Sequence, residues 1–209
     1  ANNKVIVPEV EIGKTTIEEV DCVIDRMMGS GHTSCLVDDM GQLYHGKTRV
    51  TLTDDEGKHI KVLSLTKNTN NIQVILQHLS GEAVDPAQFQ ISIHDNNGSM
   101  NYDNTLNGVD SLTYHPWYVA AVEGGVSTET DIKYHAPLAT RADKATAAIA
   151  EMTIGRLYVE NDPILHIYNV DTKKTVLKIP LKDYALMIKG HYNRSMSDQD
   201  FLDREDKFA

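Results

Sequence analysis

The stretch FQISIHD, residues 89–95, alternates apolar and polar side chains with a period of two. In an extended chain this pattern places Phe89, Ile91 and Ile93 on one face and the polar residues on the other. Such alternation is typical of a β-strand that buries one side, and it is the strongest local constraint in the sequence. A chain built from many such segments must bury its apolar faces against another sheet.

The same kind of pattern recurs along the chain and predicts further strands. The segments are TRVTLT (48–53), HIKVLSLT (59–66), NIQVILQHL (71–79), ILHIYNV (164–170) and KTVLKIPL (174–181). The last two predict a hairpin that turns across Asp171–Lys174. AAIAEMTIGRLYV (147–159) is rich in alanine, which favours a helix, but its β-branched end favours a strand from about Met152 onward.

Long polar connections separate these segments, at residues 94–110 and 122–146. They are rich in Asn, Asp, Gly, Ser and Thr, which favour turns and loops. Many short strands with such connections predict a mostly β protein, an antiparallel β-sandwich.

One helix is predicted near the N-terminus, over TTIEEVDCVIDRMMG (15–29). Thr16 would be its N-cap, two glutamates follow in the first turn, and Gly29 stands just past its end. A strand through EVDCVI (19–24) is the competing interpretation.

The charge balance excludes several classes of partner. The 209 residues contain 20 Lys and Arg against 30 Asp and Glu, a formal net charge of −10. Nucleic-acid binding and electrostatic membrane attachment both need a basic face, so neither is expected. No apolar run approaches the roughly 18–20 residues of a membrane-spanning helix.

Two cysteines, Cys22 and Cys35, are too few for a disulfide scaffold. As a pair they would close a loop of about 14 residues, worth about 3 kcal/mol in an oxidising compartment. Two separate buried thiols are an equally good interpretation. No CxxC or HxxxH spacing accompanies them, so a zinc site is not predicted.

No catalytic or cofactor signature is present in the sequence. Nine histidines are scattered without the close spacing of a helix-borne metal site. DNNGSMNYD (95–103) resembles the start of a calcium loop, but Met100 stands at position six, where an EF-hand needs Gly, and position twelve is not Glu. No GxSxG motif, phosphate-binding glycine loop or Cys–His motif occurs. We therefore expect no cofactor, no metal and no enzymatic activity, and a hydrolase is the weakest candidate.

The segment YHPWYVAAV (114–122) contains the only tryptophan, Trp117, between Tyr114 and Tyr118. Aromatic faces bind the apolar faces of sugars, so these three side chains could form a glycan platform. Core packing is the commoner role of such a cluster.

Five segments together resemble one known family, the fimbrial anchor and tip-associated lipoproteins of Bacteroides-type bacteria, which are related to the fimbrillins. In order they are DDMGQLYHGKTRVTL, VLSLTKNTNNIQVIL, FQISIHDNNGSMNYDN, IGRLYVENDPILHIYN and SDQDFLDREDKF. The closing segment, with Gln199, Phe201-Leu202 and Asp203-Arg204-Glu205, is the most specific of them.

The resemblance implies two tandem transthyretin-like, Greek-key β-sandwich domains. It also implies a surface-exposed outer-membrane location through a lipidated N-terminal cysteine, for which Cys22 lies too deep in the chain. Such proteins anchor, terminate or regulate fimbriae that grow by strand exchange between subunits, and so take part in cell adhesion. Other fimbrial subunits are the implied partners, and a glycan-binding surface module is the alternative function.

Compared with that family, the chain is expected to be a fragment. Residues 1–46 would be the C-terminal remainder of the first domain with its linker, and residues 47–209 the second sandwich without its last strands. Such a sandwich exposes an unpaired strand edge and an apolar groove, which a partner's strand would fill. The tail is expected to be a bridging segment that Phe201 and Leu202 pin to the sandwich, while Asp203, Arg204 and Glu205 face water or pair locally.

Overall fold

The computed structural model describes residues 4–29, 33–51, 60–78, 82–124, 145–192 and 195–204. Fourteen strands, two 3-10 turns and two α-helices occur in these ranges. Residues 125–144 of the connection predicted at 122–146, the ends of three predicted strands (52–53, 59 and 79) and Glu205 lie outside the described residues.

The elements follow each other in a mostly β order. The strands are β1 (Val5–Ile6), β2 (Asp21–Ile24), β3 (Met27–Met28), β4 (Ser34–Leu36), β5 (Tyr44–His45), β6 (Thr66–Lys67), β7 (Thr69–Gln77), β8 (Phe89–Asp95), β9 (Ser99–Asn101), β10 (Leu112–Tyr114), β11 (Tyr118–Gly124), β12 (Ala145–Gly155), β13 (Ile164–Asn169) and β14 (Lys174–Pro180). The helical elements are η1 (Ile17–Glu19), η2 (Pro86–Gln88), α1 (Leu181–Tyr192) and α2 (Asp198–Leu202).

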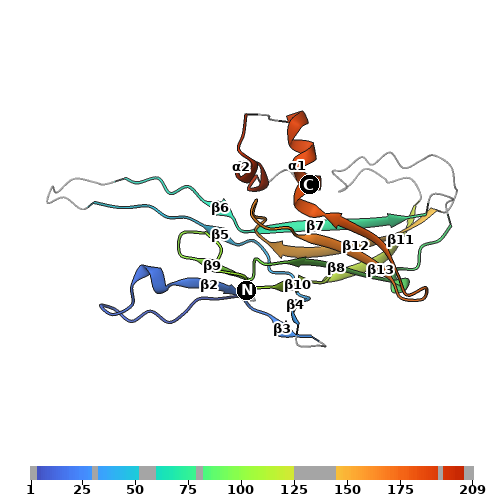
Figure 1. Ribbon diagram of the computed structural model, residues 1–209, viewed down its shortest axis with the longest axis horizontal. Coiled ribbons are helices and arrows are strands. Elements are labelled where there is room, and N and C mark those ends of the chain that lie inside the picture. Colours follow the sequence, from blue (N-terminus) through green and yellow to red (C-terminus); the bar gives the residue numbers. More distant parts are fainter. Residues whose placement is uncertain are drawn as a thin grey trace.

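Two sheets form the body of the molecule (Figure 1). One has six strands in the order β14-β13-β8-β10-β4-β3, and the other has three in the order β11-β12-β7. Smaller sheets, β1-β2-β9 and β5-β6, extend toward one end. Every ladder is antiparallel except the pairing of β10 with β4, which is parallel.

The hydrophobic core lies between the two main sheets, as the β-sandwich prediction requires. Ile91, Ile93 and Ile167 contribute from the six-stranded sheet, and Val74 and Met152 from the three-stranded sheet. The mostly β sandwich is therefore confirmed. The transthyretin-like Greek-key connectivity stays a prediction.

Four of the predicted strands match the structure closely. FQISIHD is β8, whose Ile91 and Ile93 are buried while Gln90 and His94 are exposed. NIQVILQHL contains most of β7. The predicted hairpin is formed by β13 and β14, with its turn after Asn169. Alternation succeeded for β7, β8 and β13 because each has one face against the core, whereas β14 is exposed along most of its length.

Two predicted strands, TRVTLT and HIKVLSLT, are not strands over residues 48–51 and 60–65, and only Thr66 at the end of the second belongs to a strand, β6. Only Tyr44–Lys67 and His45–Thr66 pair between these legs of the chain, as β5 and β6. The legs beyond that point have no sheet to bury their apolar side chains, and Val62 is 84% exposed. Strand propensity without a partner does not make a strand.

The predicted helix over residues 15–29 is wrong, and the competing strand is right. Only a 3-10 turn, η1, follows Thr16, whose backbone N–H donates to the Glu19 carboxylate at 2.8 Å. The chain then enters β2, which β1 and β9 flank on both sides. Pairing on two edges overrides the helical periodicity. The alanine-rich segment is likewise a strand, β12, which begins before Met152, at Ala145.

The N-terminal strands share sheets with later parts of the chain. Cys22 in β2 pairs with Met100 in β9, and Leu36 in β4 pairs with Tyr114 in β10. The described part of residues 4–46 is thus joined by hydrogen bonds to later strands, and its β3 and β4 belong to the six-stranded main sheet.

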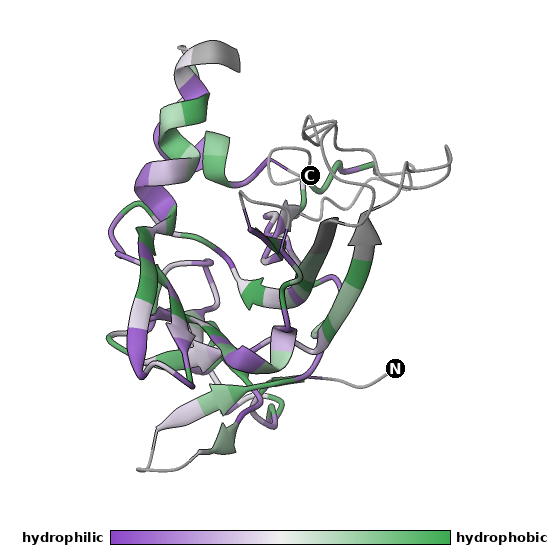
Figure 2. Ribbon diagram, turned by 90° about the vertical axis from the view of Figure 1, so that its right-hand side faces the viewer, coloured by the Kyte–Doolittle hydropathy of each residue, from purple (hydrophilic) through white to green (hydrophobic). Residues whose placement is uncertain are grey.

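Two helices near the C-terminal end of the chain were not predicted. α1 follows β14 directly and buries Leu181 and Ala185, while Tyr184 and Met187 are exposed. Figure 2 shows α1 standing above the strands, with hydrophilic and hydrophobic residues alternating along it. The spacing of the apolar residues Leu181, Ala185 and Ile188 is helical and could have indicated α1. The predicted strand before it, however, extended to Leu181 and obscured the start of the helix.

Candidate functional site

The two main sheets each end in an unpaired strand on the same side of the sandwich. β7 pairs with β12 along all its nine residues, and β14 pairs with β13. Within the described residues, neither strand has a sheet neighbour on its other edge. Both edges therefore carry backbone N–H and C=O groups that a further strand could pair with.

An apolar groove of about 410 Å³ lies between β7 and the β13–β14 hairpin. Aliphatic side chains dominate its lining: Ile72, Val74, Ile75, Leu76, Leu165, Ile167, Leu177, Ile179, Leu181 and Ile188, with Gln73 and Tyr184. Leu177 is 43% exposed even though it lines the groove. Covering such surface is favourable by about 25 cal/mol per Å² of apolar area.

One side of the groove is bordered by the positively charged strand β14, and the other by the uncharged strand β7. Lys174 and Lys178 are exposed on β14. β7 has no charged residue in its sequence TNNIQVILQ. A strand that carries carboxylates beside its apolar residues would complement the charge of β14.

Helix α1 closes one end of the groove with Leu181, Tyr184 and Ile188. Its first residue is tied to the sandwich, because the Leu181 N–H donates to the Pro163 carbonyl at 2.8 Å. Lys182 also donates to the Asp162 carboxylate at 2.7 Å and to the Val159 carbonyl at 3.0 Å. These hydrogen bonds tie the start of α1, at the end of the groove, to the sandwich.

The tail segment forms α2 and holds α1 in place. Ser197 is its N-cap and accepts from the Asp200 N–H at 3.1 Å, and Phe201 and Leu202 are buried. The predicted pinning by Phe201 and Leu202 is confirmed. Asp203 was predicted to face water or to pair locally, and this is wrong. Its carboxylate binds Arg156, which lies 47 residues earlier in the chain, and both side chains are mostly buried.

The structure separates the three predicted aromatic residues. Tyr114 is 0% exposed and its hydroxyl donates to Asn97 Oδ1 at 2.6 Å, so it belongs to the core. Burial raises the pKa of its hydroxyl far above the usual value. Trp117 and Tyr118 are 41% and 47% exposed, with ring centroids 6.1 Å apart. Only these two could form a platform for a ligand.

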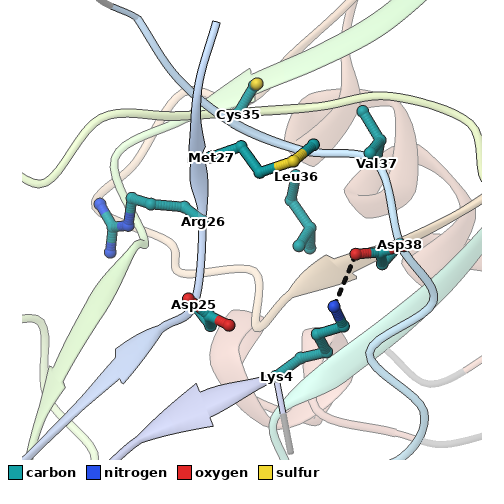
Figure 3. A pocket seen from close by; sticks show the side chains of 8 residues that line it. All are labelled: Lys4, Asp25, Arg26, Met27, Cys35, Leu36, Val37 and Asp38. Atoms are coloured by element: carbon teal, nitrogen blue, oxygen red, sulfur yellow. Dashed lines mark hydrogen bonds and ion pairs between the residues drawn. The ribbon is translucent and has the colours of Figure 1, made fainter. Parts of the chain in front are cut away.

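Both cysteines are free thiols, Cys22 half-buried in β2 and Cys35 buried in β4. Burial, with help from Asp21, raises the pKa of the Cys22 thiol. Cys35 lines a pocket of about 40 Å³ beside the Lys4–Asp38 ion pair of 2.6 Å (Figure 3). The hydrogen bond to Asp38 raises the pKa of Lys4. This pocket has room for little more than a water molecule.

The residues that suggested a calcium loop are used for internal hydrogen bonds. Asn97 Nδ2 donates to the Arg156 carbonyl at 3.0 Å, and the Gly98 N–H donates to the Asp110 carbonyl at 3.0 Å. In the described part of the chain, no three His, Cys, Asp or Glu side chains lie together as a metal site would require. No helix described there is long and apolar enough to cross a membrane.

One buried carboxyl group stands out from the rest. Asp95, at the end of β8, is 2% exposed, and burial raises its pKa to about 6. The Asn96 N–H, which donates to Oδ1 at 2.7 Å, opposes that rise. Oδ2 has no hydrogen bond of normal geometry, although the nearby Asn161 amide also lowers the pKa somewhat.

Sequence reasoning anticipated an apolar groove with an unpaired edge, but it named no residue of the groove. Alternation identified β7 and β14 as strands, since Val74 and Leu177 fall in predicted segments. Which strands stand at a sheet edge depends on pairings between distant segments. No local signal in the sequence reports those pairings.

Comparison with known proteins gives the family. The family model of fimbrillin-A associated anchor proteins Mfa1 and Mfa2 matches residues 1–209. None of the curated protein sequences compared with the chain matches it significantly.

Solved structures share the fold. A Bacteroides thetaiotaomicron protein provisionally described as an adhesin is 28% identical, with a TM-score of 0.74 over 98% of this chain and 64% of its own. A second B. thetaiotaomicron protein, provisionally described as polysaccharide-binding, is 20% identical, with a TM-score of 0.74 over 98% and 63%. The fimbrial anchor protein Mfa2 of Porphyromonas gingivalis is 17% identical, with a TM-score of 0.55 over 95% and 60%.

The chain therefore spans under two thirds of the length of these structures. The match of the family model, in contrast, covers every residue of the chain. The chain belongs to the family of fimbrillin-A associated anchor proteins Mfa1 and Mfa2.

Proposed function

We propose that this chain is a non-enzymatic structural part of a cell-surface fimbria, and that it binds another fimbrial subunit by accepting a β-strand in the groove between β7 and β14. The single observation that carries the proposal is the apolar groove of about 410 Å³ between two open strand edges. Family membership supports a fimbrial role at the cell surface.

A strand in this position would satisfy two needs at once. Its backbone would pair with an open edge, and its alternate side chains would cover Ile72, Val74 and Leu177. The incoming strand would carry large apolar residues at every second position, because only those fill the groove. Carboxylates at the other positions would meet Lys174 and Lys178.

The family resemblance extends the proposal to the parent protein. A lipid on an N-terminal cysteine of that protein would hold it in the outer membrane, while the groove holds the fimbria. Metabolic labelling with a radioactive fatty acid tests this part. A parent protein that takes up no label would contradict lipid anchoring and leave the groove proposal unaffected.

The groove is tested by Leu177→Asp in the full-length parent protein in its own bacterium. Leu177 lines the groove, so a carboxylate there would lie among the apolar residues of a bound strand. We expect fimbriae to be shed from the variant cells into the medium. Immunogold electron microscopy of the cells, with blots of cell and medium fractions, measures this.

Val176→Asp is the matched control. Val176 adjoins Leu177 on the same strand and is 55% exposed, but it is not among the groove residues. Equal amounts of both variants on the cell surface must be shown by blot. If Leu177→Asp cells retain their fimbriae as wild-type cells do, strand capture in this groove is wrong.

Glycan binding is the second candidate, favoured by the exposed pair of Trp117 and Tyr118 with rings 6.1 Å apart. One solved neighbour is provisionally described as polysaccharide-binding, but at 20% identity that likeness concerns the fold alone. A glycan array with wild type and Trp117→Ala tests the idea. Binding that Trp117→Ala abolishes would support it, and no binding by wild type would end it.

A further inference from the structure

A long two-legged arm projects from the sandwich at one end of the molecule (Figure 1). We define the arm as residues 44–51 and 60–67. Its apolar side chains are unusually exposed for a β protein: Val50 49%, Ile60 75%, Val62 84%, Leu63 47% and Leu65 59%. Contiguous apolar surface of this kind marks an interaction site more often than a free surface.

The local sequence of the arm favours strands that the isolated chain does not form. TRVTLT and HIKVLSLT have strand patterns, yet only β5 and β6 at the base of the arm are paired. The legs touch closely, because a Cβ on Gly46 would lie 2.6 Å from Leu65 Cδ2. Local preference and observed structure conflict here, and such conflicts concentrate at functional sites.

The arm is basic, although the chain as a whole has a net charge of −10. It carries Lys47, Arg49, Lys61 and Lys67 and no acidic residue. Lys47 lies 4.6 Å from the centre of the Tyr102 ring. Within the described residues none of the four forms an ion pair. The sequence between the two legs, residues 52–59, adds three acids and Lys58.

A segment of opposite charge lies at the same end of the molecule (Figure 1). We define this N-terminal segment as residues 7–19. It exposes Val7 (55%), Val10 (59%), Ile12 (99%) and Ile17 (56%). It also carries four glutamates at positions 9, 11, 18 and 19 against one lysine, Lys14, which pairs with Glu11.

From this complementarity we infer that two copies of this chain associate reciprocally, with the arm of each copy packed against the N-terminal segment of the other. Apolar residues meet apolar residues, and the cations of the arm meet Glu9 and Glu18. Pro8 has no N–H to donate, so side-chain packing and charge, rather than a strand ladder, form the contact.

Reciprocal pairing fits the placement of the two surfaces. The arm and the N-terminal segment lie at the same end of the molecule. A two-fold axis at that end therefore brings each arm onto the partner's segment in a single closed dimer. The arm does not fit the groove of a second copy. Lys174 and Lys178 are exposed on β14, the edge strand with which an inserted segment would pair, and would repel the cations of the arm. The dimer surface and the strand-accepting groove are therefore independent.

Sedimentation equilibrium of the 209-residue chain tests the inference. We expect a monomer–dimer equilibrium whose Kd rises with salt, because the contact depends on exposed charges. Arg49→Glu/Lys61→Glu should raise the Kd at least about tenfold, as opposed charges become like charges. Glu9→Lys/Glu18→Lys should do the same. Neither pair includes Glu11 or Glu19, which have internal partners.

Mixing the two double variants gives the decisive result. Each variant alone places like charges at positions 49 and 61 of the arm and at positions 9 and 18 of the partner's segment, so neither should form the dimer. In a dimer of one copy of each variant, these positions carry opposite charges at both contacts, so an equimolar mixture should dimerise with a Kd well below that of either variant alone. Lys174→Glu/Lys178→Glu, on β14, is the matched control and should dimerise as wild type does.

A wild-type chain that stays monomeric at about 200 μM overturns the inference, as does a mixture that fails to dimerise while both variants retain wild-type circular dichroism. If a charge-reversal variant does not fold, Val62→Ser/Ile60→Ser provides an independent test. It removes only exposed apolar surface and should also weaken the dimer. Unchanged dimerisation in that variant counts against the arm.

Discussion

Arg156 and Asp203 form two parallel hydrogen bonds, Nε to Oδ1 at 2.8 Å and Nη2 to Oδ2 at 2.6 Å. Arg156 also donates to the Asn104 carbonyl at 2.9 Å, and Gln199 donates to the same carboxylate at 3.0 Å. These bonds join the segment after β12 to the end of α2. A mostly buried ion pair therefore holds α2 against the sandwich, and α2 in turn packs against α1, which lines the groove.

Removing one partner of this pair should destabilise the protein. Asp203→Ala leaves the Arg156 guanidinium buried without its carboxylate, so we expect a loss of about 3 kcal/mol in the free energy of unfolding. Urea unfolding followed by circular dichroism measures it. Asp198→Ala in α2 breaks an exposed ion pair with Lys189 of α1 and should cost less than about 1 kcal/mol. Equal losses in both variants would contradict this role of Arg156.

Asp95 predicts an unusual pH dependence. Its pKa is raised to about 6 in the folded protein from 3.8. The folded state thus binds this proton more tightly than the unfolded state, and stability from this group is full below about pH 4 and lost as pH rises through 6. Asp95→Asn should therefore be more stable than wild type at pH 7.

Thermal unfolding of both proteins between pH 4 and pH 8 measures the effect. The difference in melting temperature should shrink as pH falls and be small near pH 4, where the wild-type carboxyl is protonated. A difference that is constant over this range would mean that the variant acts through packing or hydrogen bonding rather than through ionisation.

Gly155 should tolerate no side chain. A Cβ there would lie 2.9 Å from the Tyr114 hydroxyl and 3.0 Å from Asn97 Nδ2, inside the core. Gly155→Ala should therefore lower the free energy of unfolding by about 1–3 kcal/mol. Gly190→Ala is the control, because a Cβ there meets nothing within 4 Å and alanine favours helix α1. We expect it to be neutral or slightly stabilising in the same urea titration.

The two cysteines should be present as thiols in the folded protein. Burial shields Cys35, and the raised pKa of Cys22 lowers its thiolate fraction at neutral pH. Reaction with Ellman's reagent should be slow in buffer and reach two thiols per chain in denaturant without reductant. No reactive thiol in denaturant would mean a Cys22–Cys35 disulfide instead.

The sequence determined the strands that bury one face. Ile91 and Ile93 in β8 alternate with polar residues, and that period is set by the geometry of an extended chain. The hairpin of β13 and β14 was equally visible, because both strands are adjacent in sequence. The charge balance excluded a basic binding face for the chain as a whole, but it concealed the basic arm.

Only the tertiary structure decided which strands stand at sheet edges, and therefore where the groove is. The helical pattern around Cys22 gave way to β2 because β1 and β9 pair with it from both sides. Tyr114 entered the core, whereas Trp117 and Tyr118 did not. Arg156 and Asp203 met across 47 residues. Local periodicity reports which face of a strand is buried, but pairing between distant segments depends on the free energy of the whole chain.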